Sequence, residues 1–270
     1  MNVTFIGGGN MAAAMIGGLL QKGWPANAIR VVEIDDAART RLARELRIRT
    51  YAAADAEATA ADSIVLAVKP QQMREAARAL RPAIRSQLVI TIAAGIRCQD
   101  LSRWLGGYTR IVRVMPNTPA LVLAGISGLY AMPALAAADR TLAETIMSAV
   151  GATLWLEREA QIDAITAVSG SGPAYVFYFI EALQQAAADL GFNTADARRL
   201  ALETFAGAVR LAQTSGEEPA TLRARVTSKG GTTERALGVM DEQALKNIVI
   251  RAVRAAAERS HELGEELGGD

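Results

Sequence analysis

The stretch that decides the fold is Val3-Thr4-Phe5-Ile6-Gly7-Gly8-Gly9-Asn10-Met11-Ala12. A β-branched and aromatic run reaches a cluster of glycines, and a helical pattern follows from Met11 to Gln21. A GxGxxA string between a strand and a helix is typical of a dinucleotide-binding turn, because its glycines let the backbone approach a pyrophosphate and the helix N-terminus offers free N–H groups. The alternative is a glycine-rich turn that binds no ligand. The string predicts coenzyme contacts at Gly7, Gly8, Gly9, Asn10, Met11 and Ala12.

The first half of the chain alternates short apolar runs with amphipathic helical patterns. Strands are expected at Val3–Ile6, Ile29–Glu33, Ile64–Val68, Leu88–Ile92 and Ile111–Met115, and helices at Met11–Gln21, Asp36–Leu46 and Gln71–Leu80. Near-continuous apolar strands that alternate with helices predict a parallel sheet covered on both faces, which is a Rossmann-type doubly wound α/β domain. Strands at Ile126–Tyr130 and Thr153–Leu156, with a helix at Ala136–Val150 between them, would extend the sheet at its edge.

From about Glu159 onward the strand pattern stops and the chain becomes Ala-rich and helical. We therefore expect two domains, a dinucleotide-binding domain at residues 1–158 and an all-helical domain at residues 159–270. The run Tyr175–Ile180 is apolar throughout, so its helix needs burial on every side. A domain of this size has difficulty surrounding such a helix alone. The run therefore predicts that a second copy of the chain covers it.

The composition restricts the kind of partner. The 270 residues include 29 Lys and Arg against 28 Asp and Glu, a balance that favours a small ligand over nucleic acid. The N-terminus lacks the charged start of a signal peptide, and no uninterrupted apolar run is long enough to cross a membrane. Cys98 and His261 are the only residues of their kinds, which excludes an internal disulfide and leaves little material for a zinc site. These features predict a soluble, cytoplasmic protein without a bound metal.

Glu33 lies where the second strand is expected to end. An acidic side chain at that place accepts a hydrogen bond from the adenosine ribose of the coenzyme and repels a phosphate there, so Glu33 favours NADH over NADPH. Asp35 is an alternative in the same role. The opposite interpretation is that Arg39 or Arg41 reaches the phosphate of NADPH.

Five motifs together resemble one family along essentially the whole chain. IGGGNMA, AVKP, VMPNTP, SGSGPAY and TSKGGTT, in this order and spacing, are similar to the pyrroline-5-carboxylate reductases. The resemblance implies the NADH- or NADPH-dependent reduction of 1-pyrroline-5-carboxylate to proline, in a homodimer formed through the helical domain. Members of the family often form assemblies of such dimers, which the resemblance also suggests here. It also implies that the coenzyme contacts Ala67, Val68, Lys69, Pro70, Met115, Pro116 and Asn117. Without the resemblance, Pro70 would merely start a helix and Lys69 would be a solvated charge.

The TSKGGTT motif also has a chemical interpretation of its own. Two glycines and two threonines at the start of a helix direct N–H groups and hydroxyls toward one point, which suits a carboxylate. The alternative is a simple helix cap, with Glu234 as an acid in the first turn. By resemblance, the substrate contacts are Ser228, Gly230, Gly231, Thr232 and Thr233, with Thr233 near the ring nitrogen.

The absence of histidine from every motif argues against a His-driven carbonyl reduction. A protonated imine arrives already activated, so orientation and a hydroxyl hydrogen bond from Thr233 would suffice, and Thr233 is the candidate catalytic residue. The rival β-hydroxyacid dehydrogenases require a Lys and an Asn where this chain has Val176 and Ile180. A non-catalytic NAD(P) sensor is the alternative from another class, although a sensor has no need for a carboxylate site.

Overall fold

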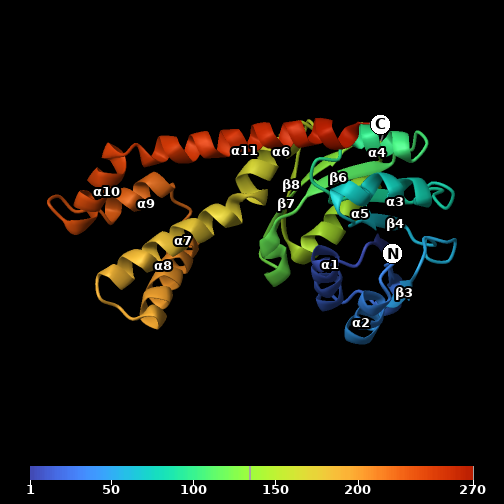
Figure 1. Ribbon diagram of the computed structural model, residues 1–270, viewed down its shortest axis with the longest axis horizontal. Helices are drawn as coiled ribbons and strands as arrows, with labels where there is room; N and C mark the ends of the chain where they lie inside the picture. The colour runs from blue at the N-terminus through green and yellow to red at the C-terminus, as the bar shows by residue number, and fades with distance from the viewer. Residues whose placement is uncertain (134, 270) are drawn as a thin grey trace. The chain divides into compact units, whose positions relative to one another are not determined.

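The computed structural model describes residues 1–133 and 135–269 (Figure 1). The chain forms two compact units, one of Met1–Ser171 with Ala256–Asp270 and the other of Gly172–Ala255. This division does not fall at the predicted boundary after residue 158. The reason is that α6 (Gln161–Ile165) packs on strands of the sheet, and the end of the last helix returns to the same unit.

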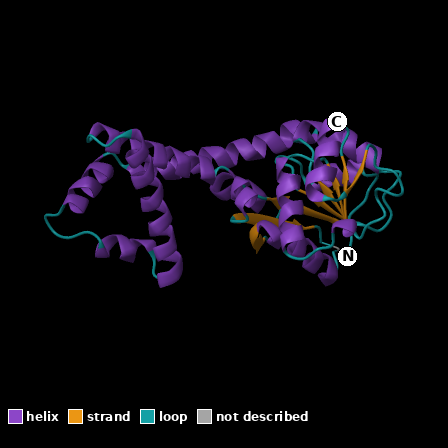
Figure 2. Ribbon diagram, turned by 90° about the horizontal axis from the view of Figure 1, so that it is seen from below, coloured by secondary structure: helices purple, strands orange, loops and turns teal. Residues whose placement is uncertain are grey.

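The first unit contains one eight-stranded sheet in the order β3-β2-β1-β4-β5-β6-β7-β8. All neighbouring pairs are parallel except β6 and β7, which are antiparallel. Figure 2 shows the strands grouped together with helices around them. The strands are β1 (Val3–Ile6), β2 (Ile29–Val32), β3 (Arg49–Tyr51), β4 (Ser63–Leu66), β5 (Leu88–Thr91), β6 (Ile111–Met115), β7 (Gly125–Ala131) and β8 (Gly151–Trp155).

The sheet is buried on both faces because alternate residues of its strands enter two different cores. Val3 and Phe5 of β1 pack in the core that includes α1, whereas Ile6 packs in the core that includes α3. The helices of this unit are α1 (Asn10–Gln21), α2 (Asp36–Leu46), α3 (Met73–Leu80), α4 (Cys98–Trp104), α5 (Ala137–Met147) and α6, with 3-10 turns η1 (Ala26–Ala28), η2 (Pro70–Gln72), η3 (Thr118–Val122) and η4 (Ser148–Val150).

The expected doubly wound fold is confirmed, with differences at the ends of elements. β2 stops at Val32, one residue before the predicted end, and α5 gives way to the 3-10 turn η4. The short edge strand β3 was not predicted, because three residues with two polar side chains carry no strand periodicity. A π-helical turn at Thr166–Gly170 follows α6 and was also not predicted.

The second unit is helical, as expected. It consists of α7 (Gly172–Asp189), α8 (Thr194–Ser215), α9 (Pro219–Arg225), α10 (Thr232–Glu242) and the first part of α11 (Leu245–Gly268), up to Ala255. Local signals set its turns: Asn193 caps α8 by accepting from the Asp196 N–H at 3.0 Å, and Gly216 ends it in the left-handed conformation. In this single chain, none of the 18 residues of α7 is buried, and Phe177 and Tyr178 are 64% and 71% exposed.

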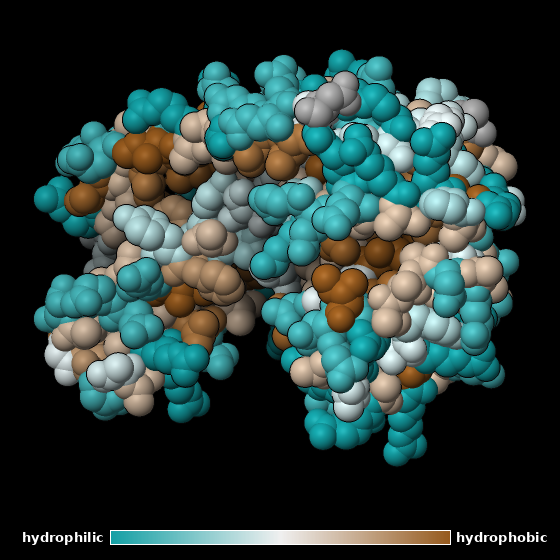
Figure 3. Space-filling model, turned by 45° about the vertical axis from the view of Figure 1, so that its right-hand side comes forward, coloured by the Kyte–Doolittle hydropathy of each residue, from teal (hydrophilic) through white to brown (hydrophobic). Residues whose placement is uncertain are grey.

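The C-terminal end of α11 belongs to the first unit and packs on the rest of that unit through small residues. Ser260, Gly264 and Gly268 recur every fourth residue and are its buried positions. The Ser260 hydroxyl donates to Asp163 Oδ1 at 2.7 Å, and Arg103 donates to the Gly268 carbonyl at 2.5 Å. Hydrophobic residues reach the surface in several places on the face shown in Figure 3. No helix of the described residues has the length and apolar character that a membrane span requires.

Candidate functional site

The glycine loop between β1 and α1 has the geometry that a pyrophosphate needs. Gly7 has φ +97°, and a Cβ there would come within 3.0 Å of the Ala67 carbonyl group, so only glycine fits without strain. Gly9, in contrast, has open space where a Cβ would lie, and it is the N-cap of α1. No side chain among the described residues caps this helix, so its first N–H groups remain available to an anion.

Glu33 joins the glycine loop to the end of β2. Its carboxylate accepts from the Gly8 N–H at 2.8 Å through Oε2 and from the Asp35 N–H at 3.0 Å through Oε1. A carboxylate has about four acceptor sites, so two remain for a ligand hydroxyl. Asp35 instead caps α2 by accepting from the Ala38 N–H at 2.7 Å. Glu33 is therefore the acid that lies beside the loop.

Arg39, the alternative contact for a phosphate, is engaged by the protein itself. Its guanidinium donates to the carbonyls of Glu33 and Ile34 at 2.8 and 3.1 Å, and it pairs with Asp36 at 2.5 Å. The side chain is 19% exposed. Arg41 is exposed on α2.

The sheet brings the other predicted coenzyme residues to the same edge. The strands β1, β2, β4 and β6 run in the same direction, so their carboxyl ends share one edge of the sheet. The glycine loop follows β1 at this edge, and the same edge carries Glu33, Ala67–Pro70 and Met115–Asn117. Ligands bind at this edge in open α/β sheets. Pro70 does begin the 3-10 turn η2, and Lys69 is exposed, so both features of the simpler interpretation are present as well.

Asn117 differs from its neighbours because its side chain is turned into the protein. It is 9% exposed, its Nδ2 donates to the Ser169 carbonyl at 3.1 Å, and its Oδ1 accepts from the Ile126 N–H at 2.9 Å. The amide therefore connects the end of β6 with the start of β7 and with the π-helical turn. Sequence reasoning predicted this residue as a coenzyme contact and did not anticipate these bonds.

The TSKGGTT segment lies in the second unit, at the start of α10. Gly230 has φ +73°, and Gly231 is the N-cap, with no side chain among the described residues capping the helix. The Gly230 N–H donates to Glu234 Oε2 at 2.6 Å. The N–H groups of the first turn, which includes Thr232 and Thr233, have no acceptor within the helix. The threonines therefore do not act as the cap, and the turn can still accept an anion.

Known proteins with the same sequence pattern identify the family. Residues 159–263 match the model described as pyrroline-5-carboxylate reductase dimerisation, and residues 2–95 match that of NADP oxidoreductase, coenzyme F420-dependent. The chain is 48% identical to the pyrroline-5-carboxylate reductase of Pseudomonas aeruginosa, over 98% of each protein. The chain belongs to the pyrroline-5-carboxylate reductase family. The reductase converts 1-pyrroline-5-carboxylate to proline, as an NAD(P)-dependent oxidoreductase of proline biosynthesis.

Solved structures agree with this assignment. The reductase resembles a pyrroline-5-carboxylate reductase from Coxiella burnetii with a TM-score of 0.92 and 41% identity, covering 97% of this chain and 98% of the other. It resembles the Plasmodium falciparum pyrroline carboxylate reductase, solved with NADP bound, with a TM-score of 0.87 and 28% identity over 98% of each chain. The expected fold class and activity are thereby confirmed.

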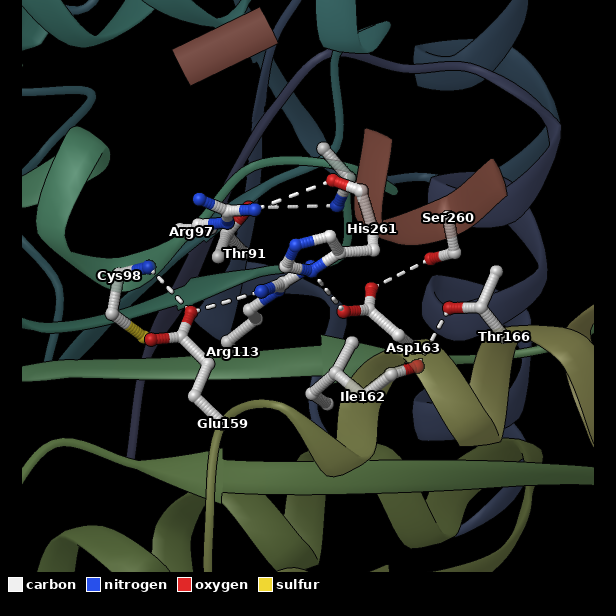
Figure 4. A network of polar contacts seen from close by, with 11 residues as sticks. Thr91, Arg97, Cys98, Arg113, Glu159, Ile162, Asp163, Thr166, Ser260 and His261 are labelled. Carbon is white, nitrogen blue, oxygen red and sulfur yellow. Dashed lines mark hydrogen bonds and ion pairs between the residues drawn. The ribbon is translucent and has the colours of Figure 1, made fainter. Parts of the chain in front are cut away.

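The structure of the reductase also contains a buried ion pair that sequence reasoning missed. Arg113 on β6 is 3% exposed, and its Nη1 lies 2.9 Å from Glu159 Oε1. The same oxygen accepts from the Cys98 N–H at 2.7 Å (Figure 4). Burial, with the Glu159 carboxylate nearby, raises the pKa of the Cys98 thiol well above its usual range. An arginine inside an apolar strand was the available signal, since a buried charge requires a partner.

Proposed function

We propose that this reductase binds its coenzyme along the edge where β1, β2, β4 and β6 end, and that it prefers NADH to NADPH. The observation that carries the preference is the Glu33 carboxylate beside the glycine loop, hydrogen-bonded to the Gly8 N–H at 2.8 Å. A fixed negative charge there favours a ribose hydroxyl and disfavours a phosphate. Arg39, tied to backbone carbonyls and Asp36, offers little to offset that charge.

Steady-state kinetics with both coenzymes test this preference directly. We expect a higher kcat/KM for NADH than for NADPH, and in Glu33→Gln we expect the ratio to shift toward NADPH by about tenfold, which corresponds to about 1.4 kcal/mol. Glu45→Gln removes the same charge from the far end of α2 and serves as the control. A wild-type preference for NADPH, or an unchanged ratio in Glu33→Gln, would refute the proposal. The Plasmodium falciparum relative holds NADP, so both coenzymes must be measured under identical conditions.

The substrate site is proposed at the start of α10. The first-turn N–H groups and the positive end of the helix suit the substrate carboxylate, with Ser228, Gly230, Gly231 and Thr232 around it. The Gly230 N–H now donates to the Glu234 carboxylate, so this hydrogen bond must break before Gly230 can donate to the substrate carboxylate. Thr233, which is half-buried in the first turn of α10, is the proposed hydrogen-bond partner of the ring nitrogen.

The reaction proposed for this site is the reduction of a protonated imine. When bound, the reduced coenzyme supplies the hydride. Because the imine already carries a positive charge, Thr233 needs only to orient the ring nitrogen and to accept or relay its hydrogen bond. Thr233→Val keeps the shape and removes the hydroxyl, and we expect kcat to fall about 100-fold. Thr233→Ser restores the hydroxyl and should recover most of the rate. Near-normal turnover in Thr233→Val would remove Thr233 from the mechanism.

A homodimer formed by the helical unit is the proposed assembly. Its support is the exposed apolar surface of α7, including Phe177 and Tyr178, in a region that matches the family's dimerisation model. Light scattering should give twice the chain mass, or an even multiple of it if dimers assemble further, and Phe177→Glu should yield monomers or insoluble protein. A wild-type monomer in solution would refute this assembly. A higher assembly of dimers and a cytoplasmic location stay predictions.

A further inference from the structure

The Asn117 amide donates to a backbone carbonyl whose α-helical partner would be a proline. In an α-helix the carbonyl of residue 169 accepts from the N–H of residue 173. Residue 173 is Pro173, which has no N–H. The turn before it is π-helical, with the Ser171 N–H donating to the Thr166 carbonyl at 2.8 Å. The Asn117 Nδ2 donates to the Ser169 carbonyl at 3.1 Å and so replaces the missing donor.

The same turn contacts the end of β6 directly. A Cβ at Gly170 would come within 2.8 Å of Met115 Cε, so the turn and the methionine are in close contact. Asn117 also holds the start of β7 by accepting from the Ile126 N–H at 2.9 Å. The two bonds of the Asn117 side chain therefore anchor the residues just before it, Met115 and Pro116, which lie at the carboxyl end of β6.

We propose that Asn117 is a positioning residue, which keeps the Met115–Pro116 segment in place by hydrogen-bonding the carbonyl that Pro173 leaves without a donor. The inference rests on the proposed coenzyme edge for its effect on catalysis, whereas the hydrogen-bond replacement itself does not. The glycine loop and Glu33 follow β1 and β2, whereas the Asn117 side chain bonds Ser169 and Ile126, so loss of the Asn117 bond should disturb the reaction more than coenzyme binding.

A double-mutant cycle tests the replacement. Asn117→Ala removes the side-chain donor to the Ser169 carbonyl, and we expect kcat to fall about tenfold, equivalent to about 1.4 kcal/mol, with the coenzyme Kd changed less than about twofold. Pro173→Ala introduces an N–H four residues after Ser169, and alone it should be close to wild type. The double variant should then recover to within about threefold of Pro173→Ala.

Two further measurements keep the test decisive. If the alanine variant does not fold, Asn117→Asp replaces it in the cycle, because Asp retains an acceptor for the Ile126 N–H and lacks the donor to Ser169. Asp also adds a buried charge, so recovery is then measured as the rise in kcat of the double variant over Asn117→Asp alone. The coenzyme Kd, measured by quenching of tryptophan fluorescence, separates a positioning effect from lost binding. Wild-type kcat in the single Asn117 variant, or no recovery in the double variant, would overturn the inference. The cycle is run with whichever coenzyme gives the higher kcat/KM, so a failed NADH preference does not affect it.

Discussion

Neutralising Glu159 should destabilise the first unit more than removing its partner. Glu159→Gln keeps the shape of the side chain and keeps an amide oxygen for the Cys98 N–H, which now binds the carboxylate at 2.7 Å. It removes the negative charge that lies 2.9 Å from Arg113 Nη1. The arginine side chain is 4% exposed, so its charge is left buried without the carboxylate that pairs with it (Figure 4).

The size of the effect follows from burial. Breaking a buried ion pair by removing one partner costs about 3–5 kcal/mol. The Glu159 side chain is 25% exposed, so water screens part of the pair, and we expect about 2–3 kcal/mol. For a unit of this size, that corresponds to a fall in Tm of roughly 4–12 °C.

Urea denaturation at a fixed protein concentration measures the free energy of unfolding, because a dimer's apparent stability depends on concentration. The control is Arg113→Met, which removes the buried charge at similar volume and leaves Glu159 able to turn toward water, so it should cost less than Glu159→Gln. The double variant should cost less than the sum of the two. A loss below about 0.5 kcal/mol in Glu159→Gln, or a larger loss in Arg113→Met, would refute the reasoning.

Three other predictions address packing, pH and thiol chemistry. Gly18→Ala should lower the free energy of unfolding by about 1–3 kcal/mol, because a Cβ there overlaps a backbone carbonyl of η4. The control Gly17→Ala has no neighbour within 4 Å of the added Cβ and should raise the free energy of unfolding by about 0.5–1 kcal/mol. Thermal unfolding of the two variants distinguishes the signs. Hydrogen bonds from Arg110 lower the pKa of Asp139 in the folded protein. The pair therefore stabilises the fold fully above the pKa of Asp in the unfolded chain, about 3.9, and this stability is lost as the pH falls through the lower pKa of Asp139 in the folded chain. Asp139→Asn should therefore cost about 1–2 kcal/mol at pH 7 and progressively less toward pH 3, and a constant difference across that range would contradict it. Cys98, buried and with a raised pKa, should not react with an aromatic disulfide reagent at pH 8 until urea unfolds the chain; rapid labelling of the native protein would contradict this.

Much of the fold could be predicted because its signals are local. Apolar runs such as Val3–Ile6 and Leu88–Thr91 are strands in the structure, and the glycine loop lies between β1 and α1 as expected. The edge strand β3 and the π-helical turn were missed, since neither has a periodic pattern of its own. Their conformations depend on the strands beside them.

Only the part of the candidate site that depends on consecutive residues could be predicted from the sequence. Gly7 and Gly9 follow from backbone requirements that can be recognised in a short motif. The bonds of Glu33 to two backbone N–H groups, and of Asn117 to Ser169 and Ile126, join residues far apart in the chain, and no local pattern indicates them.

The sequence by itself determined most of the strands and helices along the chain, the position of the coenzyme loop and the family, because periodicity and motif spacing are properties of consecutive residues. Only the tertiary structure decided which polar groups satisfy one another: Arg113 with Glu159, the Asn117 amide with the carbonyl before Pro173, and the small residues of α11 with the first unit. These pairings depend on distance after folding, since burying a polar group is tolerated only where the folded chain brings a partner within hydrogen-bonding range.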